Sequence, residues 1–263
     1  MIPGLTRSQI NRLGERLRNG PPSFSDLELL DAFRLSFDEA QQTVMQALRR
    51  LGVEPSGRIK TTISIVEKLK RESIRLSRLQ DIAGCRIVVN RTSEQDRMAA
   101  MISDALPETT LIDRRQRHSH GYRAIHIVAD IEERLVEIQI RTELQHLWAI
   151  WSETLAAAVE QSIKYGGGPK EIQQNLTSYS KVVASLESWE QNVGAAFAPM
   201  DQIQAPSALD ALMATLSGGA LRPEALAATK VIGGAMDLIR LEQDVKDRLT
   251  REILNLKSMR RKL

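Results

Sequence analysis

The sequence predicts an α/β fold, or α+β in stricter usage, in which a central β-sheet is preceded and followed by helices. Two stretches predict the sheet. Residues 85–89, CRIVV, form a short apolar run typical of a buried strand. In residues 135–142, LVEIQIRT, apolar and polar residues alternate with a period of two. Apolar residues at helical spacing predict helices from Leu27 to about Leu51 and over nearly all of the chain after Glu143.

The N-terminal third is predicted to hold two helices. Ser25, followed three residues later by Glu28, has the spacing of a capping box and favours a helix start there. Residues 52–57 then interrupt the pattern with glycine and proline. A second helix is expected to begin at one of the two threonines that precede Ile63 and to reach about Arg75.

The middle and the end of the chain follow in order. Residues 92–106 are predicted as a helix, and residues 122–131 as a strand that forms a hairpin with residues 135–142 through a polar turn. The C-terminal helices are expected to break at residues 165–169, 198–207 and 217–219. Residues 194–234, rich in Ala, Gly and Pro, are the best candidate for a flexible connection.

The last predicted helix has an apolar stripe that must pack on something. Its residues are Val245, Leu249, Ile253, Leu256 and Leu263. A second copy of the chain, a foreign partner protein and the chain's own sheet domain all remain open as the surface it covers.

Composition sets the class of protein. The chain has 263 residues, of which 42% are hydrophobic and 26% charged, as in ordinary soluble proteins. The single cysteine, Cys85, excludes an intramolecular disulfide and a Cys-rich zinc site. We find no signal-peptide pattern at the N-terminus and no apolar stretch of membrane-spanning length, so a cytoplasmic protein without a membrane partner is expected.

Positive charge is unevenly distributed. The formal net charge is +3 and the pI is about 9.1, too weakly basic to indicate nucleic-acid binding by itself. The basic residues gather at 58–78, 114–118 and 257–262. A solvated surface explains the last cluster, whereas the first two flank predicted sheet elements, where anionic ligands often bind.

The stretch RIKTTISIVEKLKR, which begins at Arg58, has the chemistry of a polyphosphate site. Ser64, Lys68 and Arg71 lie at i, i+4 and i+7 and therefore share one helix face. Arg58 and Lys60 come just before the helix N-terminus, where free backbone N–H groups favour an anion. An ordinary amphipathic surface helix is the alternative.

Two acidic residues on different predicted strands suggest a metal site. Asp81 enters the buried strand that also contains Arg86, and Glu137 lies on the alternating strand. Two carboxylates on neighbouring strands can bind Mg²⁺ together, or one can bind it while the other acts as a base. Asp81 as a simple loop cap is the alternative.

The stretch HSHGYRAIHIV offers groups for a nucleotide. If it is a strand throughout, Tyr122 and His126 point to the same face. Tyr122 could stack on a base, and His126 could hydrogen-bond a phosphate. Plain sheet residues are the alternative here too.

Together, RIKTTISIVEKLKR, DIAGCRIVV, GYRAIH and VEIQIRT occur in the order and at about the spacing of the synthetase domain of RelA/SpoT-type enzymes. The resemblance covers about residues 58–148. It implies a nucleotidyltransferase-like core with a mixed sheet of about five strands flanked by helices. It also implies an Mg²⁺-dependent transfer of pyrophosphate from ATP to the 3′-hydroxyl of GDP or GTP, giving the alarmones ppGpp and pppGpp.

The resemblance also implies roles for individual residues. The ATP-binding residues are Arg58, Lys60, Ser64, Lys68, Arg71 and Arg86. Asp81 matches the Mg²⁺-binding aspartate, and Glu137 matches the essential glutamate that assists the acceptor hydroxyl. Glu137 is also a second candidate metal ligand. The residues expected on the acceptor side are His118, His120, Tyr122, His126, Gln139 and His146.

The acceptor side departs from the family pattern. Relatives commonly read Lys-Pro-Asn-Gly-Tyr-x-Ser, whereas this chain has histidines at 118 and 120, and His146 stands where an Asn can occur. Guanine nucleotide is the first choice of acceptor. The alternatives are a toxic relative that modifies an adenosine nucleotide or the 3′ end of tRNA, for which an antitoxin could be the partner of the C-terminal helices, and a catalytically weak nucleotide- or RNA-binding module. Arg114, Arg115 and Arg117 could replace the missing charge or track an RNA backbone.

The expected organisation is an N-terminal helical extension at 1–57, a synthetase core at 58–150 and a C-terminal helical region at 151–263. Only 57 residues precede Arg58, too few for the hydrolase domain of long relatives, so synthesis alone is expected.

Overall fold

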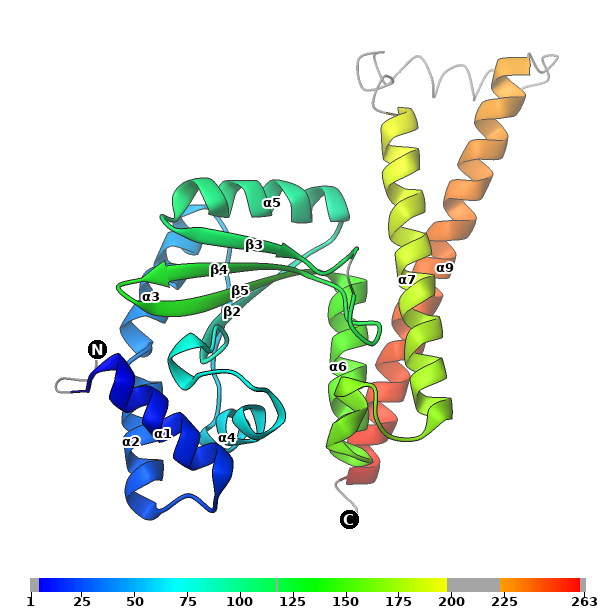
Figure 1. Ribbon diagram of the computed structural model, residues 1–263. Coiled ribbons are helices and arrows are strands. Elements are labelled where there is room, and N and C mark those ends of the chain that lie inside the picture. The colour runs from blue at the N-terminus through cyan, green and yellow to red at the C-terminus, as the bar shows by residue number, and fades with distance from the viewer. Residues whose placement is uncertain (1–4, 117, 198–222, 261–263) are drawn as a thin grey trace. The chain divides into compact units, whose positions relative to one another are not determined.

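The computed structural model describes residues 5–116, 118–197 and 223–260 (Figure 1). The chain divides into two compact units. The first comprises residues 1–90, 94–117 and 123–142, and the second comprises residues 91–93, 118–122 and 143–263.

The first unit contains the sheet. Its five strands lie in the order β1-β2-β5-β4-β3, with β2 parallel to β5 and the other neighbours antiparallel. They are β1 (Ser56–Ile59), β2 (Ala83–Val89), β3 (Thr109–Asp113), β4 (Ile125–Ile131) and β5 (Arg134–Thr142). The expected mixed sheet of about five strands is therefore confirmed.

The hairpin of β4 and β5 is also confirmed. Its turn is two residues long, Glu132 and Glu133, with Ile131 opposite Arg134. Both turn residues have positive φ, 50° and 64°. That conformation matches the right-handed twist of the flanking strands. The strand β4 begins at Ile125, later than predicted.

Sequence patterns did not locate β1 and β3. The four-residue β1 falls partly in the predicted break at 52–57, and β3 had no assignment. Both are edge strands, and three residues of β1 are exposed. A short edge strand is stabilised by pairing with its neighbour, which leaves little hydrophobic alternation in its own sequence.

Five helices complete the first unit. They are α1 (Arg7–Asn19), α2 (Phe24–Leu35), α3 (Asp38–Arg50), α4 (Thr62–Arg71) and α5 (Thr92–Ala105). The single helix predicted from residue 27 to 51 is wrong, because α2 ends before α3 begins. The predicted capping box is also shifted: Ser23 caps α2, and its Oγ accepts from the backbone N of Asp26 at 3.2 Å. Thr61 caps α4 as predicted, but that helix ends at Arg71.

The apolar face of the sheet forms the core of the first unit. Val136, Ile138 and Ile140 of β5 are fully buried, and α3 packs against β2 and β5. Gln41 of α3 is buried in this core, where its Nε2 donates to the backbone oxygens of Arg58 at 2.9 Å and Gly84 at 2.7 Å. This amide links β1 to β2.

The second unit is helical, with its own core. Its long helices are α6 (Glu143–Ala158), α7 (Lys170–Phe197) and α9 (Pro223–Arg260). On α9, Val245, Leu249 and Ile253 are buried in a cluster with residues of α6 and α7. The C-terminal stripe thus packs within the chain, on helices instead of the sheet, although Leu263 lies outside the described residues.

One of the three predicted breaks after residue 143 lies among the described residues. The break at 165–169 is confirmed, with Gly166 and Gly168 at positive φ. Those at 198–207 and 217–219 lie outside the described residues. Residues 223–234, part of the expected flexible connection, are helical in α9. Among the described helices, none is both long and apolar enough to cross a membrane.

Candidate active site

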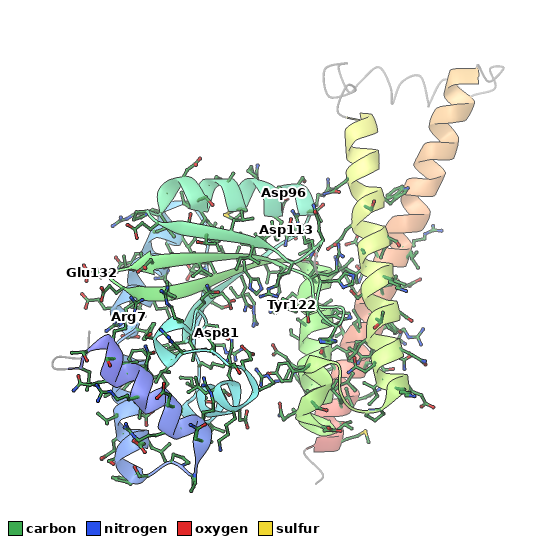
Figure 2. All side chains as sticks on the ribbon, viewed as in Figure 1. Arg7, Asp81, Asp96, Asp113, Tyr122 and Glu132 are labelled. Atoms are coloured by element: carbon green, nitrogen blue, oxygen red, sulfur yellow. The ribbon has the colours of Figure 1, made fainter. Side chains whose placement is uncertain are left out.

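Three segments of the first unit meet at Asp81, just before β2 (Figure 2). Its Oδ2 accepts hydrogen bonds from Lys60 Nζ at 2.8 Å and from Lys68 Nζ at 2.9 Å. Lys60 follows β1, and its backbone N donates to Ile82 O at 2.7 Å, which fixes the start of the lysine side chain beside the strand. Lys68 comes from the middle of α4. All three side chains are mostly buried, with 15–21% of their surface exposed.

Lys60 and Lys68 determine the charge state of Asp81. Burial alone raises the pKa of a carboxyl, but Lys60 and Lys68 outweigh that effect and hold the pKa of Asp81 below its usual value. Asp81 is therefore an anion at neutral pH. Its second oxygen, Oδ1, is buried and has no hydrogen-bond partner among the described residues.

A second group of polar contacts lies on the strand β5. The Oε2 of Glu137 accepts from Gln139 Nε2 at 2.7 Å, and Gln139 Oε1 accepts from Arg141 Nη2 at 2.8 Å. On the neighbouring strand, His126 Nδ1 lies 2.8 Å from Glu137 Oε1. Because side chains two residues apart share a face, these contacts form one continuous chain across the polar face of the sheet.

Arg141 was not among the sequence-predicted site residues. It is 3% exposed, and its bond to Gln139 orients the amide so that the nitrogen points to Glu137. The same two-residue period that relates Glu137 to Gln139 also includes Arg141, so the sequence held the signal that identifies it.

The pKa of Glu137 is also lowered. Burial raises it, but the contacts with His126 and Gln139 outweigh burial, while the negative charge of Asp81 acts in the opposite direction. Glu137 is therefore ionised at neutral pH. Asp81 comes just before β2, the strand that pairs with β5 at Glu137, so the two carboxylates belong to neighbouring strands of the sheet or their immediate flanks.

The oxygen atoms present suit Mg²⁺. Among residues 5–116, 118–197 and 223–260, no group of three or more His, Cys, Asp or Glu could hold a metal. Mg²⁺, however, is usually bound by one or two carboxylates with substrate phosphates and water. The unpartnered Oδ1 of Asp81, with Glu137 nearby, fits that mode of binding.

Gly84 allows β2 to lie close to Glu137. The two residues are opposite each other in the parallel pair of β2 and β5. A Cβ at position 84 would lie 2.9 Å from the backbone O of Glu137, closer than real Cβ atoms approach. Arg86 is two residues further on, opposite Gln139, which in turn is opposite His126. The predicted Arg86, Gln139 and His126 thus form one row across three strands.

The other predicted donor residues surround this face. Arg58 is exposed on β1 opposite Gly84. Ser64 lies at the start of α4, where its backbone N and its hydroxyl both bond Thr61 Oγ1. Arg71 ends α4 and donates to Glu72 Oε1 at 2.9 Å. Lys68 is the residue of this helix face that reaches Asp81.

Four predicted acceptor residues belong to the second unit: His118, His120, Tyr122 and His146. The side chains of His118 and His120 are exposed. Tyr122 is half-buried against the helical cluster, and its backbone N donates to Ser119 O at 2.9 Å. His146 is a half-buried residue of α6.

The prediction that Tyr122 lies in the same strand as His126 is wrong. Tyr122 forms an isolated bridge with Ser119 in a tight turn that includes His120 and Gly121, both at positive φ, and β4 begins only at Ile125. The period-two argument for a shared face therefore does not apply to it.

Arg115, one of the cations considered for phosphate or RNA, is already paired. Its Nη2 lies 2.7 Å from Asp113 Oδ2 and 2.6 Å from Asp96 Oδ1. Figure 2 labels both acids in this region of the first unit. Arg117 lies outside the described residues. The basic stretch 114–118 thus offers less open charge than its sequence indicates.

Comparison with known proteins finds a matching family model and similar proteins. A family model described as the region found in RelA/SpoT proteins matches residues 57–165. An uncharacterized protein of Mycobacterium tuberculosis is 32% identical over 180 residues, 65% of this chain and 66% of that protein, just under two thirds of its length. The GTP pyrophosphokinase YjbM of Bacillus subtilis is 31% identical over 148 residues, 50% of this chain and 67% of that protein.

Solved structures show the same fold. The small alarmone synthetase 1 from Bacillus subtilis is similar with a TM-score of 0.50 and 25% identity, over 63% of this chain and 95% of that one. The same synthetase bound to its product pppGpp gives a TM-score of 0.52 and 25% identity, over 64% and 98% of the two chains.

Proposed function

Because the chain belongs to the RelA/SpoT family, we propose that it transfers the β,γ-pyrophosphate of ATP to the 3′-hydroxyl of a guanine nucleotide, giving AMP and ppGpp or pppGpp. The observation that supports this most is the pair of ionised carboxylates at the neighbouring strands β2 and β5, with Lys60 and Lys68 on Asp81 and with His126 and Gln139 on Glu137. The activity named for the YjbM relative, GTP pyrophosphokinase, points to the same reaction.

Binding of ATP would rest on the cations around Asp81. Lys60, just before α4, and Lys68, on α4, are hydrogen-bonded to Asp81. Arg58 on β1 and Arg86 on β2 add positive charge on the strands, and Arg71 adds a cation at the end of α4. Pyrophosphoryl transfer leaves little covalent work to a protein, so positioning and charge neutralisation account for most of the rate. Mg²⁺ would be held by Asp81, with Glu137 nearby, and would offset charge on the triphosphate when bound.

The acceptor step follows from the state of Glu137. The 3′-oxygen attacks the β-phosphorus, a new bond forms between these atoms, and the bond from the β-phosphorus to the oxygen of AMP breaks. The hydroxyl proton passes to Glu137, which is ionised and ready to accept it. Its lowered pKa makes it a weak base, so its main contribution is to orient the hydroxyl until the proton leaves late in the step.

A second acceptor class has one observation in its favour. His118 and His120 stand where relatives commonly have a lysine and an asparagine, and both side chains are exposed. An imidazole offers a phosphate fewer hydrogen-bond donors than the ammonium group of a lysine, which suits an acceptor recognised by other means, such as the 3′ end of tRNA or an adenosine nucleotide. The alternative of a binding module without catalysis is weaker, because a module of that kind needs only one of the two carboxylates.

The experiment that tests the proposal uses the full chain, ATP labelled in the γ-phosphate, Mg²⁺ and a panel of GDP, GTP, ADP, ATP and tRNA at low and moderate salt. Label is expected in a guanine nucleotide at both salt concentrations. Label in tRNA alone, with steep loss as salt rises, would assign the other acceptor. Absence of transfer to every acceptor would leave only the binding module.

A further inference from the structure

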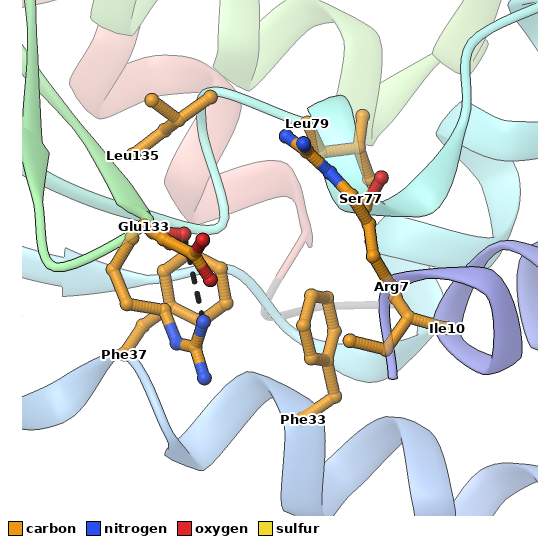
Figure 3. Close-up of a pocket in the computed structure, with 9 residues that line it drawn as sticks. Arg7, Ile10, Phe33, Phe37, Ser77, Leu79, Glu133 and Leu135 are labelled. Carbon is orange, nitrogen blue, oxygen red and sulfur yellow. Dashed lines mark hydrogen bonds between the residues drawn. The ribbon is translucent and has the colours of Figure 1, made fainter. Parts of the chain in front are cut away.

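A pocket at the hairpin end of the sheet lies within the first unit and contains none of the residues discussed above as donor or acceptor groups. It encloses about 430 Å³ of empty space, part of it open to solvent. Figure 3 shows its walls: Arg7 of α1, Phe33 of α2, Phe37 before α3, Ser77 of the short 3-10 helix η1 (Leu76–Arg78), and the turn between β4 and β5.

Arg134, the first residue of β5, is a buried cation on the pocket wall. It is only 6% exposed, and its guanidinium lies 5.9 Å from the ring centroid of Phe33 and 5.2 Å from that of Phe37. Its Nε donates to Ser36 Oγ at 3.2 Å, and its Nη1 reaches Glu133 O at 3.5 Å. The third nitrogen, Nη2, is buried and has no acceptor among the described residues.

No carboxylate of the described residues forms an ion pair with Arg134. Glu133 is the acidic residue of the wall, and its exposed carboxylate acts on Arg134 only at a distance. Burial accordingly lowers the pKa of the guanidinium, as it does for a cation without a close counter-charge. A buried charge of this kind is costly unless something compensates it.

Two more donors face the same space. The Oγ of Ser77 is buried and has no hydrogen-bond partner in the described structure, although its backbone N is bonded to Asn11 Oδ1 at 3.2 Å. The guanidinium of Arg7 is exposed at the pocket and makes no hydrogen bond or ion pair with the described residues. The pocket therefore has three groups able to donate and lacks the acceptors that would satisfy them.

We propose that this pocket binds a compact oxyanion of the phosphate class, held by Arg134, Ser77 and Arg7. Charge-assisted hydrogen bonds from guanidinium groups to such an anion are short and strong. Because part of this space is open solvent, the enclosed part suits only a compact group such as a single phosphate. The anion can be inorganic phosphate or the phosphate of a nucleotide, and both present the same oxygens.

This site is separate from the proposed active site. Arg134 lies three residues before Glu137 on β5, so the two side chains project from opposite faces of the strand. The proposal therefore does not depend on the proposed function, and either can fail alone.

The test is a titration of the full chain, labelled with ¹⁵N, with inorganic phosphate and separately with AMP, at ionic strength held constant with sodium chloride. Backbone amide signals of residues 77–79 and 133–135 report on the pocket, and those of Lys60 and Lys68 report on the proposed active site. Saturable shifts are expected at the pocket amides. Binding of phosphate identifies the free anion as sufficient, and binding of AMP alone identifies a nucleotide phosphate.

Variants decide which groups hold the anion. We expect Ser77→Ala and Arg7→Gln each to weaken binding by about tenfold, the loss expected for one hydrogen bond to a charged group. Arg12→Gln removes an exposed arginine of the same helix, whose side chain donates a hydrogen bond to Ser8, and should leave binding unchanged. Arg134→Met should abolish binding of the anion. If that variant does not fold, Ser77→Ala and Arg7→Gln still test the proposal. Shifts confined to Lys60 and Lys68, or wild-type affinity in both Ser77→Ala and Arg7→Gln, would overturn the proposal.

Discussion

The polar face of the sheet and the segment from His118 to Tyr122 differ in how firmly their side chains are held. Beside the sheet, just before β2, Asp81 is bonded to two lysines. On β5, Glu137 contacts His126 and Gln139, and Gln139 in turn accepts from Arg141. In the segment, His118 and His120 are exposed, and Tyr122 alone packs on a hydrophobic cluster.

This difference fits two separate tasks, catalysis at the sheet face and recognition of the acceptor at the segment. A site that stabilises charge in a transition state works best when its dipoles and charges are already in place. The sheet face meets that requirement through contacts among its own residues. Recognition of an acceptor can rest on a stacking surface and on groups that settle only when the ligand arrives. We therefore expect substitutions on the sheet face to affect chemistry and donor binding, and substitutions in the segment to affect the acceptor KM.

The largest effect is expected from Glu137→Gln. The change keeps the size of the side chain and removes the charge that orients the 3′-hydroxyl, so kcat should fall by about 100-fold or more, while the affinity for a non-hydrolysable ATP analogue stays within about twofold. Glu15→Gln alters an exposed glutamate of α1 and is the matched control. Turnover of Glu137→Gln near that of wild type would remove Glu137 from the mechanism.

Lys68→Met is expected to weaken binding of the ATP analogue by about 10- to 100-fold, because it removes a charge-assisted contact with the polyphosphate. Lys70→Met, on the exposed side of the same helix, should bind like wild type. Equilibrium binding measures both. Equal affinities for the two variants would mean that α4 is an ordinary amphipathic helix and that Lys68 serves only Asp81.

Tyr122→Ala should raise the acceptor KM by about 5- to 150-fold, because base stacking on an aromatic ring contributes about 1–3 kcal/mol, and should leave ATP affinity unchanged. Tyr122→Phe retains the ring and should keep a KM close to that of wild type. Steady-state kinetics with a saturating donor gives both values. A loss in the Phe variant equal to that in the Ala variant would assign the effect to the hydroxyl, not to stacking.

The smallest effect concerns stability in acid. The pKa of Asp81 is lower in the folded chain than its usual value, so the stabilisation from its lysine contacts is fully present above the unfolded-state pKa and is lost as pH falls through the folded one. In denaturant titrations between about pH 5 and pH 2, the free energy of unfolding of Asp81→Asn should therefore fall less steeply than that of wild type. Asp104→Asn, at an exposed site with no ion pair to any described residue, should follow wild type. Identical slopes for all three proteins would show that the contacts of Asp81 do not stabilise the fold.

The same contrast explains what sequence patterns could predict. Glu137 and Gln139 follow a two-residue period, and Lys68 follows a helical one, because buried neighbours force regular spacing on those segments. The contact of Lys60 and Lys68 with Asp81 is not visible in the sequence, since it joins segments that are 13 and 21 residues apart and depends on how they pack.

Sequence patterns did not predict the structure correctly where the chain turns. The tight turn at His120 and Gly121 displaced Tyr122 from the predicted strand, and positive φ at a histidine has no sequence signal comparable to that of glycine. The capping box was assigned to Ser25 and Glu28, because Ser23 with Asp26 makes the same hydrogen bonds with a shorter acid. The edge strands β1 and β3 were missed because their stability comes from pairing with neighbours.

The measurement that tests the central claim most directly is the stoichiometry of products, determined by mass spectrometry and chromatography of AMP, ADP and the acceptor after reaction of the full chain with ATP, Mg²⁺ and GDP or GTP. The account predicts that one AMP appears for each guanine nucleotide that gains two phosphates, and that no ADP forms. ADP formed with a singly phosphorylated acceptor, or AMP formed without any modified guanine nucleotide, would contradict it.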